Sequence, residues 1–174
     1  MKQQDRPVRA LGLGMVLAAL LLGGCARVND TSMRLVSSKV NAFLIVNGQL
    51  LGGSVLLVPD RTGRVSFEAE QGPVRSCSGS LRYTATSGAD IDVRCNDGAQ
   101  VALQTTLLSE TRGYGYGSTA KGPASIVFGL PMQEALAYLT VPPGMGLKIG
   151  EDSGELELKP LPTGTDAAAK PAGP

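Results

Sequence analysis

The sequence contains no histidine and no tryptophan, and only 4% of its 174 residues are aromatic. The missing histidine removes the side chain that most often serves as a general base and most often binds a metal ion. No CxxC pair is present to build a zinc or redox site without histidine. We therefore expect no metal site, no cofactor and no enzymatic activity.

An excess of charge of one sign is also lacking. The chain carries 16 Lys+Arg and 15 Asp+Glu residues. The first 24 residues hold three of the basic and one of the acidic side chains, which leaves 150 residues with 13 basic and 14 acidic groups. A nearly neutral domain has no field that attracts phosphates, so we expect no nucleic-acid partner. A chain of this length builds one hydrophobic core, which favours a single domain.

The chain opens with an apolar run that is too short to span a membrane. Ala10–Leu22 is apolar or glycine throughout and follows the basic residues Lys2, Arg6 and Arg9. A membrane-spanning helix needs about 20 apolar residues, whereas an export signal needs fewer and carries such basic residues in front. The run ends at Leu22-Gly23-Gly24-Cys25, which is an aliphatic residue, two small residues and a cysteine.

This segment resembles the leader of bacterial lipoproteins, whose lipobox has that pattern. The resemblance implies transfer of a diacylglyceryl group to the Cys25 thiol, cleavage after Gly24 and acylation of the new amine. Several acyl chains, at about 0.8 kcal/mol per buried CH₂, would anchor the protein in the membrane. Because Ala26 and not aspartate follows Cys25, the resemblance implies the outer membrane, with the domain facing the periplasm. An ordinary secretory signal with a chance cysteine is the alternative.

Export would place Cys77 and Cys95 where disulfides persist, and with Cys25 lipidated only one pairing remains. Ser76–Ala85 and Ala89–Asn96 both alternate apolar and polar residues, which is typical of half-buried strands. Both cysteines fall on the apolar face. We predict an antiparallel hairpin with a disulfide, in which apolar residues pair as Cys77–Cys95, Gly79–Val93, Leu81–Ile91 and Tyr83–Ala89.

Other segments show the same strand pattern between turn signals. Further strands are expected at Asn41–Val46, Ser54–Val58, Arg64–Glu70, Ala99–Leu108, Ala124–Phe128 and Leu156–Leu158. Pro131 stands at the first position of one expected helix, Met132–Leu139. The pattern predicts a mostly β fold, an antiparallel β-sandwich or open barrel with one short C-terminal helix. The predicted organisation is a signal peptide (1–24), a lipidated N-terminus and tether (25–40), a β-rich domain (41–159) and a disordered Pro/Ala/Gly tail (160–174).

A glycine-rich segment, Arg112 to Gly122, reads RGYGYGSTAKG. Its Gly115-x-Gly117-x-x-Ala120 spacing loosely matches a dinucleotide fingerprint, but the following Gly-Pro denies the helix that this motif needs. A P-loop is excluded because Ala120 stands where glycine must precede the lysine. Ser118 and Lys121 form an S-x-x-K pair, the nucleophile motif of penicillin-binding proteins, which requires one helical turn in a stretch that is a poor helix former.

Two readings of this segment remain. In the first it is a structural loop whose glycines adopt positive φ. In the second it is a binding loop, with Arg112, Tyr114, Tyr116 and Lys121 as the candidate contact residues, because alternating tyrosine and glycine offers aromatic surface on an adaptable backbone.

The mature part also resembles small uncharacterised proteobacterial lipoproteins, in residues 77–83, 95–98, 113–117, 122–123 and 128–130. That resemblance implies a fold but no activity. We therefore predict a non-enzymatic lipoprotein with a structural or interaction role, whose partners are the membrane and an envelope protein. The alternatives are a small periplasmic hydrolase or acyl-transfer enzyme that uses Ser118 and Lys121, and an accessory subunit of an envelope assembly.

Overall fold

The computed structural model of the protein describes residues 37–151 and 154–162. The chain forms two units that divide between Ser37 and Ser38, and the description below concerns the second unit. The predicted signal peptide, Cys25, most of the tether and the tail beyond residue 162 lie outside the described residues.

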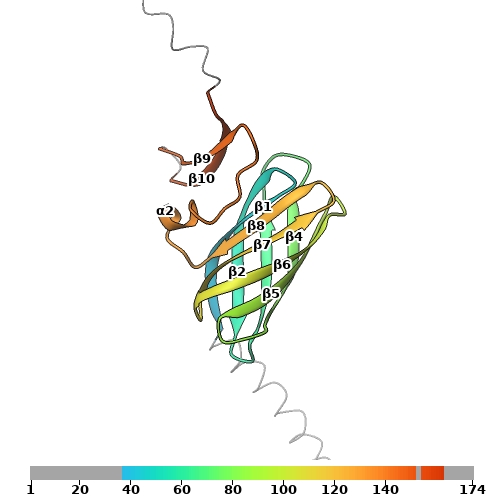
Figure 1. The fold of residues 1–174 in the computed structure, drawn as a ribbon, viewed down its shortest axis with the longest axis vertical. Helices are drawn as coiled ribbons and strands as arrows, with labels where there is room; N and C mark the ends of the chain where they lie inside the picture. The colour runs from blue at the N-terminus through green and yellow to red at the C-terminus, as the bar shows by residue number, and fades with distance from the viewer. Residues whose placement is uncertain (1–36, 152–153, 163–174) are drawn as a thin grey trace, which may run out of the picture. The chain divides into compact units, whose positions relative to one another are not determined.

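Eight antiparallel strands follow one another around a closed barrel (Figure 1). They are β1 (Ser38–Val46), β2 (Gln49–Val58), β3 (Thr62–Glu68), β4 (Ser76–Tyr83), β5 (Gly88–Cys95), β6 (Gln100–Ser109), β7 (Arg112–Thr119) and β8 (Gly122–Phe128). Each strand pairs with the next, so that short turns suffice to connect them. The first strand begins at Ser38, three residues before the expected strand Asn41–Val46.

The last barrel strand returns to the first. Ala42–Ile45 of β1 pairs with Ser125–Phe128 of β8, and the Gly129 N–H continues this ladder by donating to the Asn41 carbonyl at 2.8 Å. The prediction of a mostly β antiparallel fold is confirmed, but the sandwich or open barrel is wrong because the barrel is closed. Closure removes both sheet edges, which would otherwise expose unpaired backbone groups.

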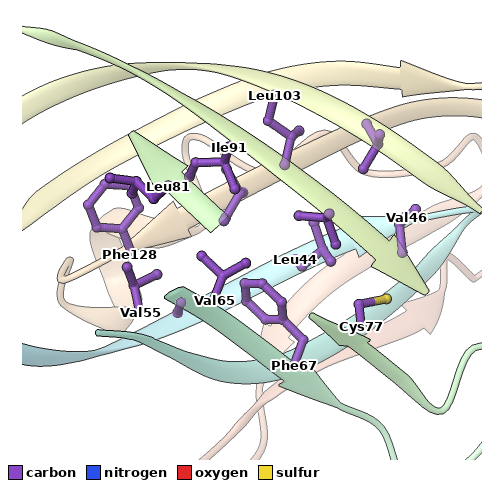
Figure 2. Close-up of a cluster of buried hydrophobic side chains, with 14 of the residues drawn as sticks. Leu44, Val46, Val55, Val65, Phe67, Cys77, Leu81, Ile91, Leu103 and Phe128 are labelled. Atoms are coloured by element: carbon purple, nitrogen blue, oxygen red, sulfur yellow. The ribbon is translucent and has the colours of Figure 1, made fainter. Parts of the chain in front are cut away.

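The core lies inside the barrel. Side chains alternate along each strand, so every second residue points inward, and the inward residues are almost all apolar. Figure 2 shows such side chains converging from different strands; the largest fully buried ones include Leu44, Phe67, Leu81, Ile91, Leu103 and Phe128. The interior of an eight-stranded barrel is just wide enough to be filled in this way. The barrel is therefore packed by its own side chains.

The hairpin of β4 and β5 has the predicted register. Cys77 and Cys95 form a disulfide with an S–S distance of 2.02 Å. The other predicted pairs are also confirmed: Gly79–Val93, Leu81–Ile91 and Tyr83–Ala89.

The C-terminal segment covers the outside of the barrel where β1 and β8 meet. It comprises helix α2 (Met132–Ala135) and a two-stranded sheet of β9 (Met145–Ile149) and β10 (Leu156–Pro160). Its apolar residues pack on two outward residues of the barrel; the buried cluster comprises Ile45, Val127, Leu130, Ala135, Leu139 and Leu156.

The helix is shorter than the predicted Met132–Leu139. The chain turns after Ala135, and the Thr140 N–H donates to the buried Ser125 Oγ at 2.8 Å, which holds the segment against β8. The following Pro142-Pro143 cannot continue a helix. Within the described ranges, no helix is long and apolar enough to cross a membrane.

We expect the disulfide to stabilise the barrel by about 3 kcal/mol, the chain-entropy value for cysteines 18 residues apart. The free energy of unfolding, measured by urea titration, should fall by this amount in the Cys77→Ala/Cys95→Ala double variant. Reduction of the unchanged protein by dithiothreitol is the matched control, because it opens the bond without removing atoms from the core. Equal stabilities in the oxidised and reduced protein would contradict this expectation.

Candidate functional site

The glycine-rich segment is a strand and not a loop. Residues 112–119 form β7, between β6 and β8 in the barrel wall. Gly113 and Gly115 are buried on the inward face, whereas Tyr114 and Tyr116 alternate with them on the outward face. Gly113, Gly115 and Gly117 have no positive φ, so the predicted reason for their presence is wrong for these three, whereas Gly122, the first residue of β8, has φ 142° as predicted.

The glycines of β7 are required because there is no room for a side chain. A Cβ atom built on Gly117 would lie 2.3 Å from the carbonyl oxygen of Ala102. One on Gly115 would lie 2.7 Å from Oγ1 of Thr105, a buried hydroxyl with no hydrogen-bond partner among the described residues. One on Gly113 would lie 2.7 Å from the ring of Phe128. The sequence did carry a signal for this strand that the loop prediction missed, namely the strict alternation of glycine and tyrosine.

The outer face of β7 carries a cluster of aromatic rings. Tyr114 stacks on Tyr138 from the C-terminal segment, with ring centroids 4.3 Å apart and planes inclined by 20°. Tyr116 meets Tyr114 edge to face at 5.8 Å and remains 44% exposed. Partial burial raises the pKa of the Tyr116 hydroxyl, and the neighbouring Tyr114 and Tyr138 raise it further. The phenol therefore stays neutral at physiological pH and offers a ring together with a hydrogen-bonding hydroxyl.

Arg112 anchors this face to α2. Its guanidinium Nη2 lies 2.7 Å from Oε2 of Glu134, and both side chains are about half exposed. An exposed ion pair contributes little stability, but it limits the directions in which Arg112 can point. Of the predicted contact residues, Arg112, Tyr114 and Tyr116 thus lie on one outer face.

Lys121 lies elsewhere, in the turn after β7. Its Nζ is 3.3 Å from Oδ2 of Asp97, which also accepts a hydrogen bond from Asn47 Nδ2 at 2.9 Å. Thr119 Oγ1 donates to Oδ1 of Asn47 at 2.7 Å. This polar network joins the turns β1–β2, β5–β6 and β7–β8 at one end of the barrel. Lys121 and the tyrosines do not form one site.

The S-x-x-K pair is not helical. Ser118 lies in β7 opposite Pro123, and Lys121 follows in the turn. In the part of the chain that the structure describes, these two side chains share no hydrogen bond, and the Lys121 amine is paired with Asp97. The motif chemistry needs serine and lysine one helical turn apart, and this strand does not provide that spacing.

A groove of 1090 Å³ lies between the outer face of β1–β2 and the β9–β10 hairpin. Gly52 is among its lining residues, and a Cβ added there would meet no atom within 4 Å. Its lining mixes apolar and acidic side chains, among them Phe43, Leu50, Met132, Met145, Glu68 and Glu70. No cluster of three or more His, Cys, Asp or Glu residues that could hold a metal ion occurs in residues 37–151 and 154–162.

Comparison with known proteins gives no family. No family model matches the chain, and no curated protein matches it. The chain is similar to the solved structure of a redesigned β-barrel, at 20% identity and with a TM-score of 0.43, over 57% of this chain and 94% of that one.

We expect Gly117→Ala to destabilise the protein by about 1–3 kcal/mol, the usual cost of overpacking, because its Cβ has no room beside Ala102. Gly52→Ala is the matched control, since its Cβ enters open space and its φ is not positive. Urea unfolding should show a lower midpoint for Gly117→Ala and an unchanged or slightly higher midpoint for Gly52→Ala. Similar midpoints for the two variants would disprove the steric explanation.

We expect Asp97 to stabilise the fold more when its carboxylate is ionised than when it is protonated. A hydrogen bond from the Ala99 backbone lowers the pKa of Asp97 below its ordinary value of 3.8, and Lys121 and Asn47 lower it further, against the opposing effect of burial. A lowered folded-state pKa gives stability that is present above pH 3.8 and is lost as the pH falls through the folded-state value.

The test compares thermal unfolding of Asp97→Asn and the unchanged protein at neutral pH and at progressively lower pH. The variant should melt lower at neutral pH, and the difference should shrink on acidification. Asp92→Asn is the control, because Asp92 is exposed on β5. A difference that does not depend on pH would argue against the ionic contribution.

Proposed function

We propose that this protein is a lipoprotein anchored to the outer membrane through Cys25, and that its β-barrel serves a structural or interaction role in the periplasm. The lipobox at Leu22–Cys25 supports the anchor. The Cys77–Cys95 disulfide fits an oxidising compartment such as the periplasm.

One observation carries the interaction role: the barrel interior is filled by the protein's own side chains. A barrel that carries a small molecule keeps a cavity inside its wall. Because the interior is occupied, another molecule can contact this domain only on the outer surface. The outer surface of the barrel is therefore the part best suited to bind a partner.

The outer face of β7 is the best candidate for that contact. Tyrosine and arginine are the residue types that most often dominate binding energy at interfaces, and Arg112, Tyr114 and Tyr116 lie together there. The stacking of Tyr114 on Tyr138 holds the face in place. An accessory role in an envelope assembly would use the same face. We do not propose the hydrolase, because the amine of Lys121 is paired with Asp97 and Ser118 lies on a strand.

We expect Cys25→Ser to release the protein from membranes. Without the thiol no diacylglyceryl group can be attached, so no acyl chain holds the protein in the membrane and a soluble periplasmic form should result. Membrane flotation and labelling with a palmitate analogue measure the outcome, and Cys77→Ser/Cys95→Ser is the control that should keep both the label and the membrane association. A Cys25→Ser protein that still floats with membranes and carries the label would refute the anchor.

A further inference from the structure

We propose that the groove between the barrel wall and β10 binds an extended basic peptide segment of a partner protein, which adds as a further strand to the free edge of β10. This site goes beyond the proposed function, because it uses a surface other than the outer face of β7 and does not depend on the lipid anchor. It follows from the unpaired backbone of β10, from the open space over Gly52 and from the charge of the groove.

The β9–β10 hairpin has free sheet edges, which the barrel lacks. The eight barrel strands close on themselves, whereas β9 and β10 form a two-stranded sheet outside the barrel (Figure 1). The Gly150 N–H donates to the carbonyl of Glu155, the residue opposite in the register, at 2.8 Å, so the bonded positions of β10 are its odd-numbered residues. Leu156 and Leu158 therefore direct their N–H and C=O groups away from β9, and Pro160 directs its carbonyl there.

The groove runs along this free edge. Five consecutive residues of β10, 155–159, line it, whereas β9 contributes its first residue, Met145. A side-chain face of a strand would contribute every second residue, so the consecutive lining indicates an edge. Unpaired N–H and C=O groups along an edge are a template for an added strand. Five residues give this template a length of about 17 Å.

The opposite wall of the groove holds a notch over Gly52. In the register Gly52 lies between Phe43 of β1 and Glu68 of β3. A Cβ atom added to Gly52 would meet no atom within 4 Å, so the space between the aromatic ring and the carboxylate is open. A lysine or arginine side chain fits such a notch, because its aliphatic stem packs on an apolar surface while its charged head reaches the carboxylate.

The charge of the groove selects a basic occupant. Its lining includes four acidic residues, Glu68, Glu70, Glu155 and Glu157, and one basic residue, Lys159, which is paired with Glu157. Glu68 and Glu70 are exposed, and within the described ranges their carboxylates form no ion pair. The whole chain is nearly neutral, with 16 basic and 15 acidic residues. The groove thus has a local excess of negative charge, which favours a cationic partner.

Two other occupants match this charge less well. A second copy of β10 would bring Glu155, Glu157 and Lys159, which together add one more negative charge. Residues 163–174 of the chain itself hold one aspartate and one lysine, so their side chains carry no excess of positive charge. A separate basic segment remains the occupant that fits both the free edge and the acidic wall.

Strand addition also determines which peptide residues enter the notch. The Leu156 side chain is buried in the cluster with Ile45 and Val127 of the barrel wall, so Leu158, two residues later, points toward the same side. A residue of the added strand that bonds to Leu158 directs its side chain to that side too. The basic residues of the peptide should therefore alternate, and their own backbone groups should bond to β10.

The test titrates the full-length lipidated protein, in micelles of an uncharged detergent, into a fluorescein-labelled heptapeptide of alternating lysine and threonine that begins with lysine. Fluorescence anisotropy should show saturable binding, and the matched glutamate–threonine peptide should not bind. Two analogues keep the charge and change the backbone. N-methylation of the lysines should abolish binding, because it removes the N–H groups that bond to β10, whereas N-methylation of the threonines should leave it nearly unchanged.

Variants of the protein locate the site. Leu158→Pro should weaken binding about tenfold relative to Leu158→Ala, because proline removes the N–H that faces the groove and no bond to β9. Gly52→Leu should weaken binding more than Gly52→Ala, because the longer side chain fills the notch. Glu68→Gln should weaken it about threefold, as expected for an exposed ion pair.

Asp92→Asn is the matched control for lost charge, because it removes an exposed carboxylate on β5, outside the groove, and should leave binding unchanged. Urea midpoints identify any variant that has lost stability. Should Leu158→Pro unfold, the N-methylated peptides test the same backbone bonds on the unchanged protein.

Three results would overturn the inference: no saturable binding of the lysine–threonine peptide, equal binding of its two N-methylated analogues, or binding that Gly52→Leu and Glu68→Gln both leave unchanged. Self-association in the micelles that Leu158→Pro abolishes would instead assign the edge to a second copy. Tighter peptide binding after removal of residues 163–174 would assign it to the chain's own tail. Either of these last two results would also refute a separate basic partner.

Discussion

The hydrogen bonds between β1 and β8 are the constraint on which the rest of the structure depends. They join strands from opposite ends of the barrel sequence, with Ala42 opposite Phe128 and Ile45 opposite Ser125. Once these strands pair, every inward residue faces another inward residue across a narrow interior, and the sheet has no edge left to protect. The inside is then closed to ligands, because apolar side chains fill it. Closure thus determines how the core is packed, and it leaves the outer surface of the barrel as the place where another molecule could make contact.

The seam where β1 and β8 meet explains the C-terminal segment. Five consecutive residues of β8, Ala124–Phe128, are buried, so this strand is covered on both faces and not only on the inner one. Ile45 and Val127 point outward at the seam, and leaving them in water would cost about 1.5–3 kcal/mol for each side chain. α2 and the β9–β10 hairpin cover them. The same segment brings Tyr138 against Tyr114 and so shapes the aromatic face of β7.

The three turns at one end of the barrel show why Lys121 and the tyrosines separate. Along a strand the chain rises by about 3.4 Å per residue, so a short stretch of sequence can place its members at opposite ends of a wall. Lys121 lies at the turn and pairs with Asp97, whereas Arg112 begins β7 at the other end and pairs with Glu134. A segment that seems a single loop in the sequence therefore contributes to two separate places on the surface.

Local pattern was enough to determine the β4–β5 hairpin. Alternation set which side chains share a face, and the two cysteines at matching positions set the register that the disulfide shows. The same pattern failed for β7, where glycine in place of apolar residues suggested a loop. Those glycines are explained only by atoms from other strands, such as the Ala102 carbonyl and the Phe128 ring, which occupy the space that side chains would need. Closure itself, and the stacking of Tyr138 on Tyr114, were also left to the tertiary structure. Alternation acts between neighbours in the chain, whereas pairing of the first strand with the last depends on how the whole sheet twists and curls.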